Sequence, residues 1–150
     1  MPLVLDVQGF KNEKNQFLIK EFAGYNGSYT FHCIFKPPFE YEDLSKEYKK
    51  QANWLMAYHH CIDWEAGFTD YNLFPNIIQH LTKNVVQVYV KGKEKADYLS
   101  KFLKTPVLTL PESPPLQQQQ KSCFFHSRDI CMCALTNVYT LYNCLNKTIE

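Results

Sequence analysis

The chain has 150 residues, a hydrophobic fraction of 45% and a formal net charge of +1 at pH 7. This length suits one compact domain, and this hydrophobic fraction excludes wholesale disorder. The near-zero charge excludes a strongly basic or acidic protein. It neither requires nor excludes a nucleic-acid partner, because a local basic groove is compatible with a neutral total.

The sequence predicts neither a membrane helix nor a secretory signal peptide. No window holds the ~20 apolar residues that a membrane helix needs, so we expect no membrane partner. The first ten residues, "MPLVLDVQGF", reach a charge and a glycine too early for a signal peptide. We therefore expect an intracellular protein, cytoplasmic or nuclear, in which clustered cysteines bind metal more often than they form disulfides.

The N-terminal part predicts three strands joined by tight turns. The segments 3–10, 16–25 and 29–38 are rich in apolar and β-branched residues, and turn residues separate them at 12–15 and 26–28. A proline pair ends the third strand, because proline cannot continue a ladder. These short connections predict an antiparallel meander.

Helical and strand patterns then alternate along the chain. Apolar spacing predicts helices and short strands in this order: helix 41–60, helix 71–84, strand 85–92, helix 93–104, strand 106–110 and helix 132–145. The segment 111–122, rich in proline and glutamine, is predicted to be a flexible loop.

The order of the elements predicts one α/β domain over residues 1–150. Strands that are connected through helices run parallel, so three antiparallel strands should be followed by parallel ones, with helices on both faces of a mixed sheet. This is the layout of ribonuclease H-like (RNase H-like) domains.

Within that layout the chain resembles the DEDDh 3′–5′ exonucleases. Four segments are collinear with the motifs of that family: "VLDVQGF" in the first strand, "HHCIDWEAGFTDYNLFPNIIQHL" (59–81), "VYVKGKEKADYL" (88–99) and "MCALTNV" (132–138). The resemblance covers roughly the whole chain in the order of its elements. It implies an exonuclease-like fold.

The resemblance also implies that the catalyst is lost. Enzymes of that family hold two magnesium or manganese ions with four carboxylates and use a histidine as general base. The corresponding positions here hold Asp6, Gln8, Lys95 (or its neighbour Ala96), Met132 and Asn137. Glutamine and asparagine carry no negative charge, and hard divalent ions prefer charged oxygen ligands. We therefore expect neither bound magnesium or manganese nor two-metal catalysis.

The segment "KSCFFHSRDICMC" (121–133) predicts a structural zinc site. Cys123, His126, Cys131 and Cys133 place four soft ligands within eleven residues, and zinc prefers tetrahedral sets of thiolate and imidazole. Such a metal would fix how the last helix enters the sheet. The alternative is that Cys131 and Cys133 fill apolar space at the start of that helix.

The same segment is similar to the Maelstrom domain of animal germline RNA-silencing factors. That domain looks like the same exonuclease fold without its catalytic residues, and it carries a Glu-Cys-His-Cys zinc set. Cys123, His126 and Cys131 match the Cys-His-Cys part, and Asp6 or Cys133 is the candidate for the fourth ligand. The pattern "KPP" (36–38), "VYVKGKEK" (88–95) and "CALTN" (133–137), in a chain rich in lysine, asparagine and tyrosine, also resembles uncharacterised multi-copy proteins of arthropod genomes and of their viruses or transposons.

Four lysines, Lys91, Lys93, Lys95 and Lys101, concentrate positive charge at the end of one strand and along the next helix. We expect them to contact phosphates of single-stranded RNA or DNA, and a solvated helix face is the alternative.

The predicted function is a catalytically degenerate exonuclease-fold module that binds nucleic acid or a protein partner, in RNA silencing or mobile-element biology. One alternative is an active nuclease. It would be a metal-independent ribonuclease, or it would use carboxylates near the motif positions, namely Asp63, Glu65, Asp70, Glu94 and Asp97. The other alternative is a purely structural adaptor.

Overall fold

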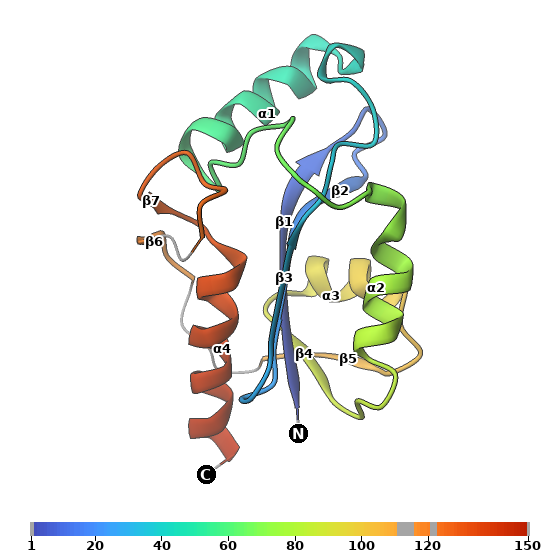
Figure 1. Ribbon diagram of the computed structural model, residues 1–150, viewed down its shortest axis with the longest axis vertical. Helices are drawn as coiled ribbons and strands as arrows, with labels where there is room; N and C mark the ends of the chain where they lie inside the picture. Colours follow the sequence, from blue (N-terminus) through green and yellow to red (C-terminus); the bar gives the residue numbers. More distant parts are fainter. Residues whose placement is uncertain (1, 111–115, 121–122, 150) are drawn as a thin grey trace.

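The computed structural model describes residues 2–110, 116–120 and 123–149. Its elements are, in chain order, β1 (Leu3–Lys11), β2 (Phe17–Tyr25), β3 (Thr30–Ile34), η1 (Tyr41–Asp43), α1 (Lys46–Tyr58), η2 (Tyr71–Leu73), α2 (Phe74–Leu81), β4 (Val88–Val90), α3 (Lys93–Ser100), β5 (Val107–Thr109), β6 (Gln119–Gln120), β7 (Ile130–Cys131) and α4 (Ala134–Ile149) (Figure 1). Within this part of the chain, no helix combines the length and apolar character that crossing a bilayer requires.

Five strands form one mixed sheet in the order β3-β2-β1-β4-β5. The pairs β1–β2 and β2–β3 are antiparallel, whereas β4 runs parallel to β1 and β5 runs parallel to β4. The prediction of an α/β fold with three antiparallel strands followed by parallel ones is therefore confirmed. The sheet is mixed because β3 follows β2 through a tight turn, while helices connect to β4 and β5.

The segment 111–122 differs in part from the predicted loop. Residues 111–115 and 121–122 lie outside the described residues. Gln119 and Gln120, however, form strand β6, which pairs antiparallel with β7. This small ribbon was not predicted, because neither partner has the alternating apolar pattern that marks a strand.

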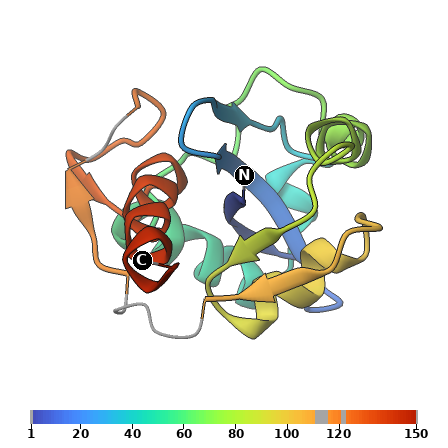
Figure 2. The same ribbon diagram turned by 90° about the horizontal axis from the view of Figure 1, so that it is seen from below.

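Helices cover both faces of the sheet (Figures 1 and 2). On one face α4 packs Val138, Leu141 and Leu145 against Val4 of β1 and Ala23 of β2. On the other face α2 and α3 cover a second core, whose centre is formed by Leu5, Phe22, Phe74, Ile78 and Leu99. The central strands are buried on both faces, which explains their near-continuous apolar sequence.

Strand β1 is longer than its parallel neighbour. Its register with β4 runs through Leu3↔Val88 and Val4↔Tyr89, and β4 ends at Val90 while β1 continues to Lys11. The pairing with β2 shifts register between Gln8 and Gly9. Such a bulge bends the strand and re-aims its side chains. The far half of β1 is thus free of β4, and α1 and α3 lie beside it.

Candidate functional site

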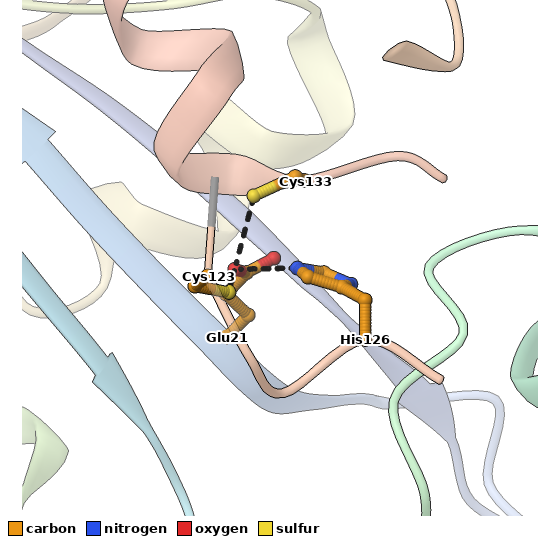
Figure 3. A group of neighbouring side chains, drawn as sticks. All are labelled: Glu21, Cys123, His126 and Cys133. Carbon is orange, nitrogen blue, oxygen red and sulfur yellow. Dashed lines mark hydrogen bonds and ion pairs between the residues drawn. The ribbon is translucent and has the colours of Figure 1, made fainter. Parts of the chain in front are cut away.

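Four side chains from distant parts of the chain converge beside the start of α4 (Figure 3). Glu21 comes from β2, Cys123 and His126 from the segment before β7, and Cys133 directly precedes α4. One possible ligand atom from each of the four lies within 4.8 Å of the others. Glu21, His126 and Cys133 are buried, and Cys123 is half-buried. We call these four residues the metal-ligand group.

The separations within the group suit a metal ion. His126 Nε2 lies 3.2 Å from Glu21 Oε2. Cys123 Sγ and Cys133 Sγ lie 3.9 Å and 3.8 Å from the same oxygen. A tetrahedral zinc site with bonds of 2.0–2.3 Å has ligand atoms about 3.3–3.8 Å apart. The group can therefore bind a metal ion, and its dimensions are compatible with structural zinc.

Neighbouring groups orient two of these ligands. His126 Nδ1 donates a hydrogen bond to the carbonyl of His60, which orients the ring so that Nε2 faces Glu21 Oε2. Glu21 Oε1 accepts a 2.8 Å hydrogen bond from the backbone N–H of Ala134. His32 Nε2 donates to Glu21 Oε2 at 2.8 Å. Glu21 thus caps the first turn of α4 with one oxygen and offers the other to the group.

Within the metal-ligand group, Glu21 gives up its proton readily, whereas His126 and Cys123 hold theirs tightly. Burial works against ionisation of Glu21, but hydrogen bonds from His126 and His32 outweigh it and lower the pKa of Glu21. Burial also opposes charge on His126, yet its contacts with Cys133 and Glu21 raise the pKa of His126 to about 10. The contact with Cys133, followed by burial, raises the pKa of Cys123 far above its ordinary value. Metal binding releases such protons.

The group differs from the predicted zinc ligands at one position. Cys123, His126 and Cys133 belong to it, and Glu21 takes the place of Cys131. Cys131 lies in β7, opposite Gln119, and its side chain is buried in a small cluster with Cys61. Asp6, the other candidate for the fourth ligand, lies outside the group. The signal that could have pointed to Glu21 is a carboxylate within a mainly apolar strand, where Lys20 is the other charged residue.

A second cluster contains three of the positions that the sequence comparison aligned with the exonuclease motifs. Asp6 of β1 is fully buried. Lys95 Nζ, from the first turn of α3, donates to Asp6 Oδ1 at 2.6 Å. Asn137 Nδ2, from the first turn of α4, donates to Asp6 Oδ2 at 2.8 Å. We call Asp6, Lys95 and Asn137 the Asp6 cluster. Met132 stands apart from it, and its N–H donates to the carbonyl of His59 at 2.9 Å.

A pocket of about 490 Å³ opens beside this cluster, between β1, α1 and α3. Its walls are mainly apolar and aromatic, and polar atoms come from few side chains. The lining comprises Val7, Gln8, Gly9, Phe10, Lys11, Phe17, Gln51, Trp54, Leu55, His59, Glu94, Lys95 and Tyr98. The pocket occupies the space beside the part of β1 that extends past β4.

Two features of the pocket wall stand out. The Nε2 atom of Gln8 is buried and has no hydrogen-bond partner among the described residues, and only 5% of Gln8 is exposed. On another wall the rings of Trp54 and His59 stack at 5.9 Å with an interplanar angle of 21°. Burial, reinforced by the charge of Lys95, lowers the pKa of His59, so its ring is neutral at neutral pH.

Of the four predicted phosphate-binding lysines, Lys95 alone lines the described pocket. Lys93 Nζ pairs with Asp97 at 2.9 Å. The ammonium of Lys101 lies 6.0 Å from the centre of the Tyr98 ring. Lys91 is half-buried just after β4.

The carboxylates proposed for a relocated nuclease site do not gather into a metal site. Glu94 pairs with Lys11 at 2.9 Å and Asp97 with Lys93, while Asp70 lies 3.8 Å from Lys36. Asp63 Oδ1 accepts the backbone N–H of Glu65. Among the described residues, one group of three or more His, Cys, Asp or Glu side chains could hold a metal ion. That group is the metal-ligand group, and none of these five carboxylates belongs to it.

The described residues therefore form two candidate sites, the metal-ligand group and the pocket with the Asp6 cluster. Both lie at the start of α4: Cys133 directly precedes this helix, and Asn137 lies in its first turn. Comparison with protein-family models, with curated proteins and with solved structures finds no match to this chain.

Proposed function

We propose that the chain is a catalytically inactive, RNase H-like domain that binds single-stranded nucleic acid, RNA in particular, and that one structural zinc ion stabilises it. One observation carries the proposal. The ammonium of Lys95 lies 2.6 Å from the buried carboxylate of Asp6, at the edge of an aromatic pocket. A lysine ammonium held beside aromatic walls supports this proposal, because lysines contact phosphates and bases stack on aromatic side chains.

The proposal draws its fold assignment from two features. The sheet order β3-β2-β1-β4-β5, with a parallel second half, is the arrangement expected of the exonuclease-like class. In addition, Asp6, Lys95 and Asn137 lie together although 89 and 131 residues separate Asp6 from its two partners. These are positions that the resemblance to DEDDh exonucleases aligned with metal-binding carboxylates.

The charge balance of the Asp6 cluster favours binding over hydrolysis. Both oxygens of Asp6 accept hydrogen bonds from protein donors. Asn137 and Gln8 are neutral, so a pair of divalent ions would meet one carboxylate whose oxygens are already engaged. Asp6 holds the Lys95 ammonium in place and accepts one of its three N–H donors, so the ammonium can still contact a phosphate directly.

The metal-ligand group serves structure in this proposal. All four ligands come from the protein, which is the composition of a closed structural zinc site without a position for substrate. Bound zinc would supply a crosslink between β2 and the segment 123–133. The backbone N–H of Asn137 donates to the carbonyl of Cys133 at 2.9 Å, so the position of Cys133 also sets that of Asn137 on Asp6.

The test is binding of fluorescently labelled oligonucleotides of about 12 nucleotides, measured by anisotropy at about 0.05 M salt without added magnesium. We expect single-stranded RNA to bind and Lys95→Ala to weaken binding about tenfold, because one phosphate contact and one orienting charge are lost. Lys93→Ala is the matched control, since Lys93 lies on the same helix, is 86% exposed and pairs with Asp97. It should change affinity less than about twofold.

Two results would overturn the proposal. Absence of binding of single-stranded RNA and DNA at low salt would leave an adaptor role. Trimming of RNA from its 3′ end in magnesium or manganese, abolished by Asp6→Ala, would establish an active nuclease.

A further inference from the structure

The pocket has the dimensions and lining of a small-molecule site. Its volume of about 490 Å³ falls within the range of about 300–1,000 Å³ that is typical of ligand pockets. Such sites combine apolar walls with a few placed polar groups. Here Val7, Phe10 and Leu55 contribute apolar surface, and Lys95 and Gln8 contribute polar groups.

Gln8 indicates that a ligand brings a hydrogen-bond acceptor. Its Nε2 is buried without an acceptor among the described residues, and Gln8 is one of the residues that line the pocket. A buried donor left unsatisfied costs about 1–3 kcal/mol. A ligand that places an acceptor on this amide removes that penalty when it binds.

Trp54 and His59 indicate that the ligand contains a flat ring. Their rings are nearly parallel, at 21°, and both line the pocket. Trp54 is 55% exposed, so much of its ring is open to a partner. Stacking of a base on an aromatic side chain contributes about 1–3 kcal/mol.

Lys95 indicates that the ligand carries an anion. Its ammonium has three N–H donors, of which the Asp6 carboxylate accepts one. The side chain is 28% exposed and lines the pocket. Lys11, the other lysine of the lining, is paired with Glu94, a carboxylate that lines the pocket as well and would repel a phosphate there. Asp6, the carboxylate paired with Lys95, is fully buried and does not line the pocket. Lys95 is therefore the group placed to receive a phosphate.

We propose that the pocket binds one nucleoside monophosphate unit, with its base on the Trp54–His59 pair, an acceptor on Gln8 and its phosphate at Lys95. The unit has two sources with the same chemistry, a free mononucleotide or the end of a nucleic-acid strand. This inference deepens the proposed function, because it uses the same pocket.

The test is isothermal titration calorimetry with adenosine and uridine monophosphates, with the corresponding nucleosides and with inorganic phosphate. We expect a monophosphate to bind at least about tenfold more tightly than its nucleoside or inorganic phosphate, because the nucleoside and the phosphate each fill only part of the site. Trp54→Ala should weaken binding about tenfold, given the energy of one stacking contact. Phe124→Ala is the matched control, because Phe124 is 98% exposed and lies outside the pocket.

Gln8→Leu separates a binding role from a structural one. It should weaken monophosphate binding about tenfold while leaving the midpoint of thermal unfolding of the free protein unchanged or raised, because it removes an unsatisfied donor. Equal affinity of wild type and Gln8→Leu for the monophosphate, whatever the midpoint of unfolding, would overturn the assignment of Gln8 and with it the proposed site.

Linear and circular RNAs of one sequence distinguish the two sources. Binding of free monophosphates identifies the mononucleotide as a ligand. If monophosphates bind but RNA and DNA strands do not, the proposed function is overturned and this inference stands. Binding of linear but not circular RNA identifies a strand end. Equal binding of linear and circular RNA, without competition by monophosphates, would overturn this inference and leave the proposed function standing. Failure of every probe would overturn both.

Discussion

Asn137 Nδ2 donates a 2.8 Å hydrogen bond to Asp6 Oδ2, across the interface between α4 and the central strand β1. One turn earlier on the same helix, the N–H of Ala134 donates to Glu21 of the metal-ligand group. The first turn of α4 therefore contacts both chemical centres of the molecule. A change in the position of this turn is expected to alter the metal site and the pocket edge together.

Loss of a metal ligand should lower metal content and stability together. We expect Cys123→Ser to reduce bound zinc from one ion per chain to a substoichiometric amount, measured by atomic emission of the purified protein. Because the proposed metal would crosslink β2 to the segment before α4, the free energy of unfolding should fall by about 3 kcal/mol or more. In a chain of 150 residues this corresponds to a drop of about 6–12 °C in the unfolding midpoint.

Cys144→Ser is the control for that experiment. Cys144 lies on α4 outside the metal-ligand group and is half-buried. It should leave the metal content unchanged. Full zinc occupancy in both variants would contradict the assignment of Cys123, and a chelator that leaves the wild-type unfolding midpoint unmoved would contradict a stabilising metal.

The Asp6–Lys95 pair should behave as a coupled unit. Lys95→Met leaves the buried Asp6 carboxylate with the hydrogen bond from Asn137 but without its ion-pair partner, and we expect a loss of about 1–3 kcal/mol in unfolding free energy, measured in urea. The loss stays below that of a fully buried pair, because the Lys95 side chain is 28% exposed. Combining it with Asp6→Asn should recover part of the loss, since no unpaired charge remains.

The control for these single and double substitutions is Lys93→Met, which breaks an exposed ion pair with Asp97 on the same helix. It should change the free energy of unfolding by less than about 0.5 kcal/mol. Strict additivity of Lys95→Met and Asp6→Asn would rule out the coupling.

Gly9 is required by close approach of the backbone at the bulge. An added Cβ would lie 2.0 Å from the carbonyl oxygen of Leu18. We expect Gly9→Ala to cost about 3 kcal/mol or more in urea unfolding, because a main-chain atom cannot yield without moving the strand. Gly24→Ala is the control in the neighbouring strand, since its nearest atom is a side-chain methyl of Leu5 at 3.0 Å. Equal losses for the two substitutions would contradict this explanation.

Stability should fall in alkali through Tyr98. Burial, and then the phenol of Tyr71, raise the pKa of Tyr98 well above its ordinary value of 10.0. Below about pH 10 both states keep the proton and stability does not depend on it. Above that pH the unfolded chain binds fewer protons than the folded one, so stability falls by up to ~1.4 kcal/mol per pH unit.

Urea unfolding at about pH 9 and about pH 11 in wild type and Tyr98→Phe measures this effect. The substitution should reduce the alkaline slope. Tyr29→Phe should not, because Tyr29 is 79% exposed. An unchanged slope in Tyr98→Phe would refute the prediction.

The fold could be predicted from the sequence because its signals are local. The turn at 26–28, the proline pair after the third strand and the helical spacing of 132–145 each act within a few residues. The order of helices and strands along the chain then indicated which strands run parallel, because strands connected through a helix are parallel. The β6–β7 ribbon escaped prediction because its stability comes from neighbours distant in sequence rather than from its own residues.

The ligand Glu21 could not be selected from the sequence because 102 residues separate it from Cys123. The spacing of residues along the sequence can identify ligands only within one segment. By that criterion Cys131 and Cys133 were equally suitable as zinc ligands. Tertiary packing distinguishes them, since Cys131 is held in the β6–β7 ribbon while Cys133 faces Glu21 before α4. The pocket, likewise, results from the unequal lengths of β1 and β4, which no local pattern encodes.

The distance along the chain between Glu21 and the other ligands has a consequence for biosynthesis. A ribosome releases Glu21 long before Cys123, His126 and Cys133, and the four meet only when β2 and the start of α4 have docked. A chain interrupted before Cys133 lacks a ligand, and a full-length chain with α4 detached cannot assemble the set. Metal occupancy would therefore mark the molecules that have been completed and correctly folded.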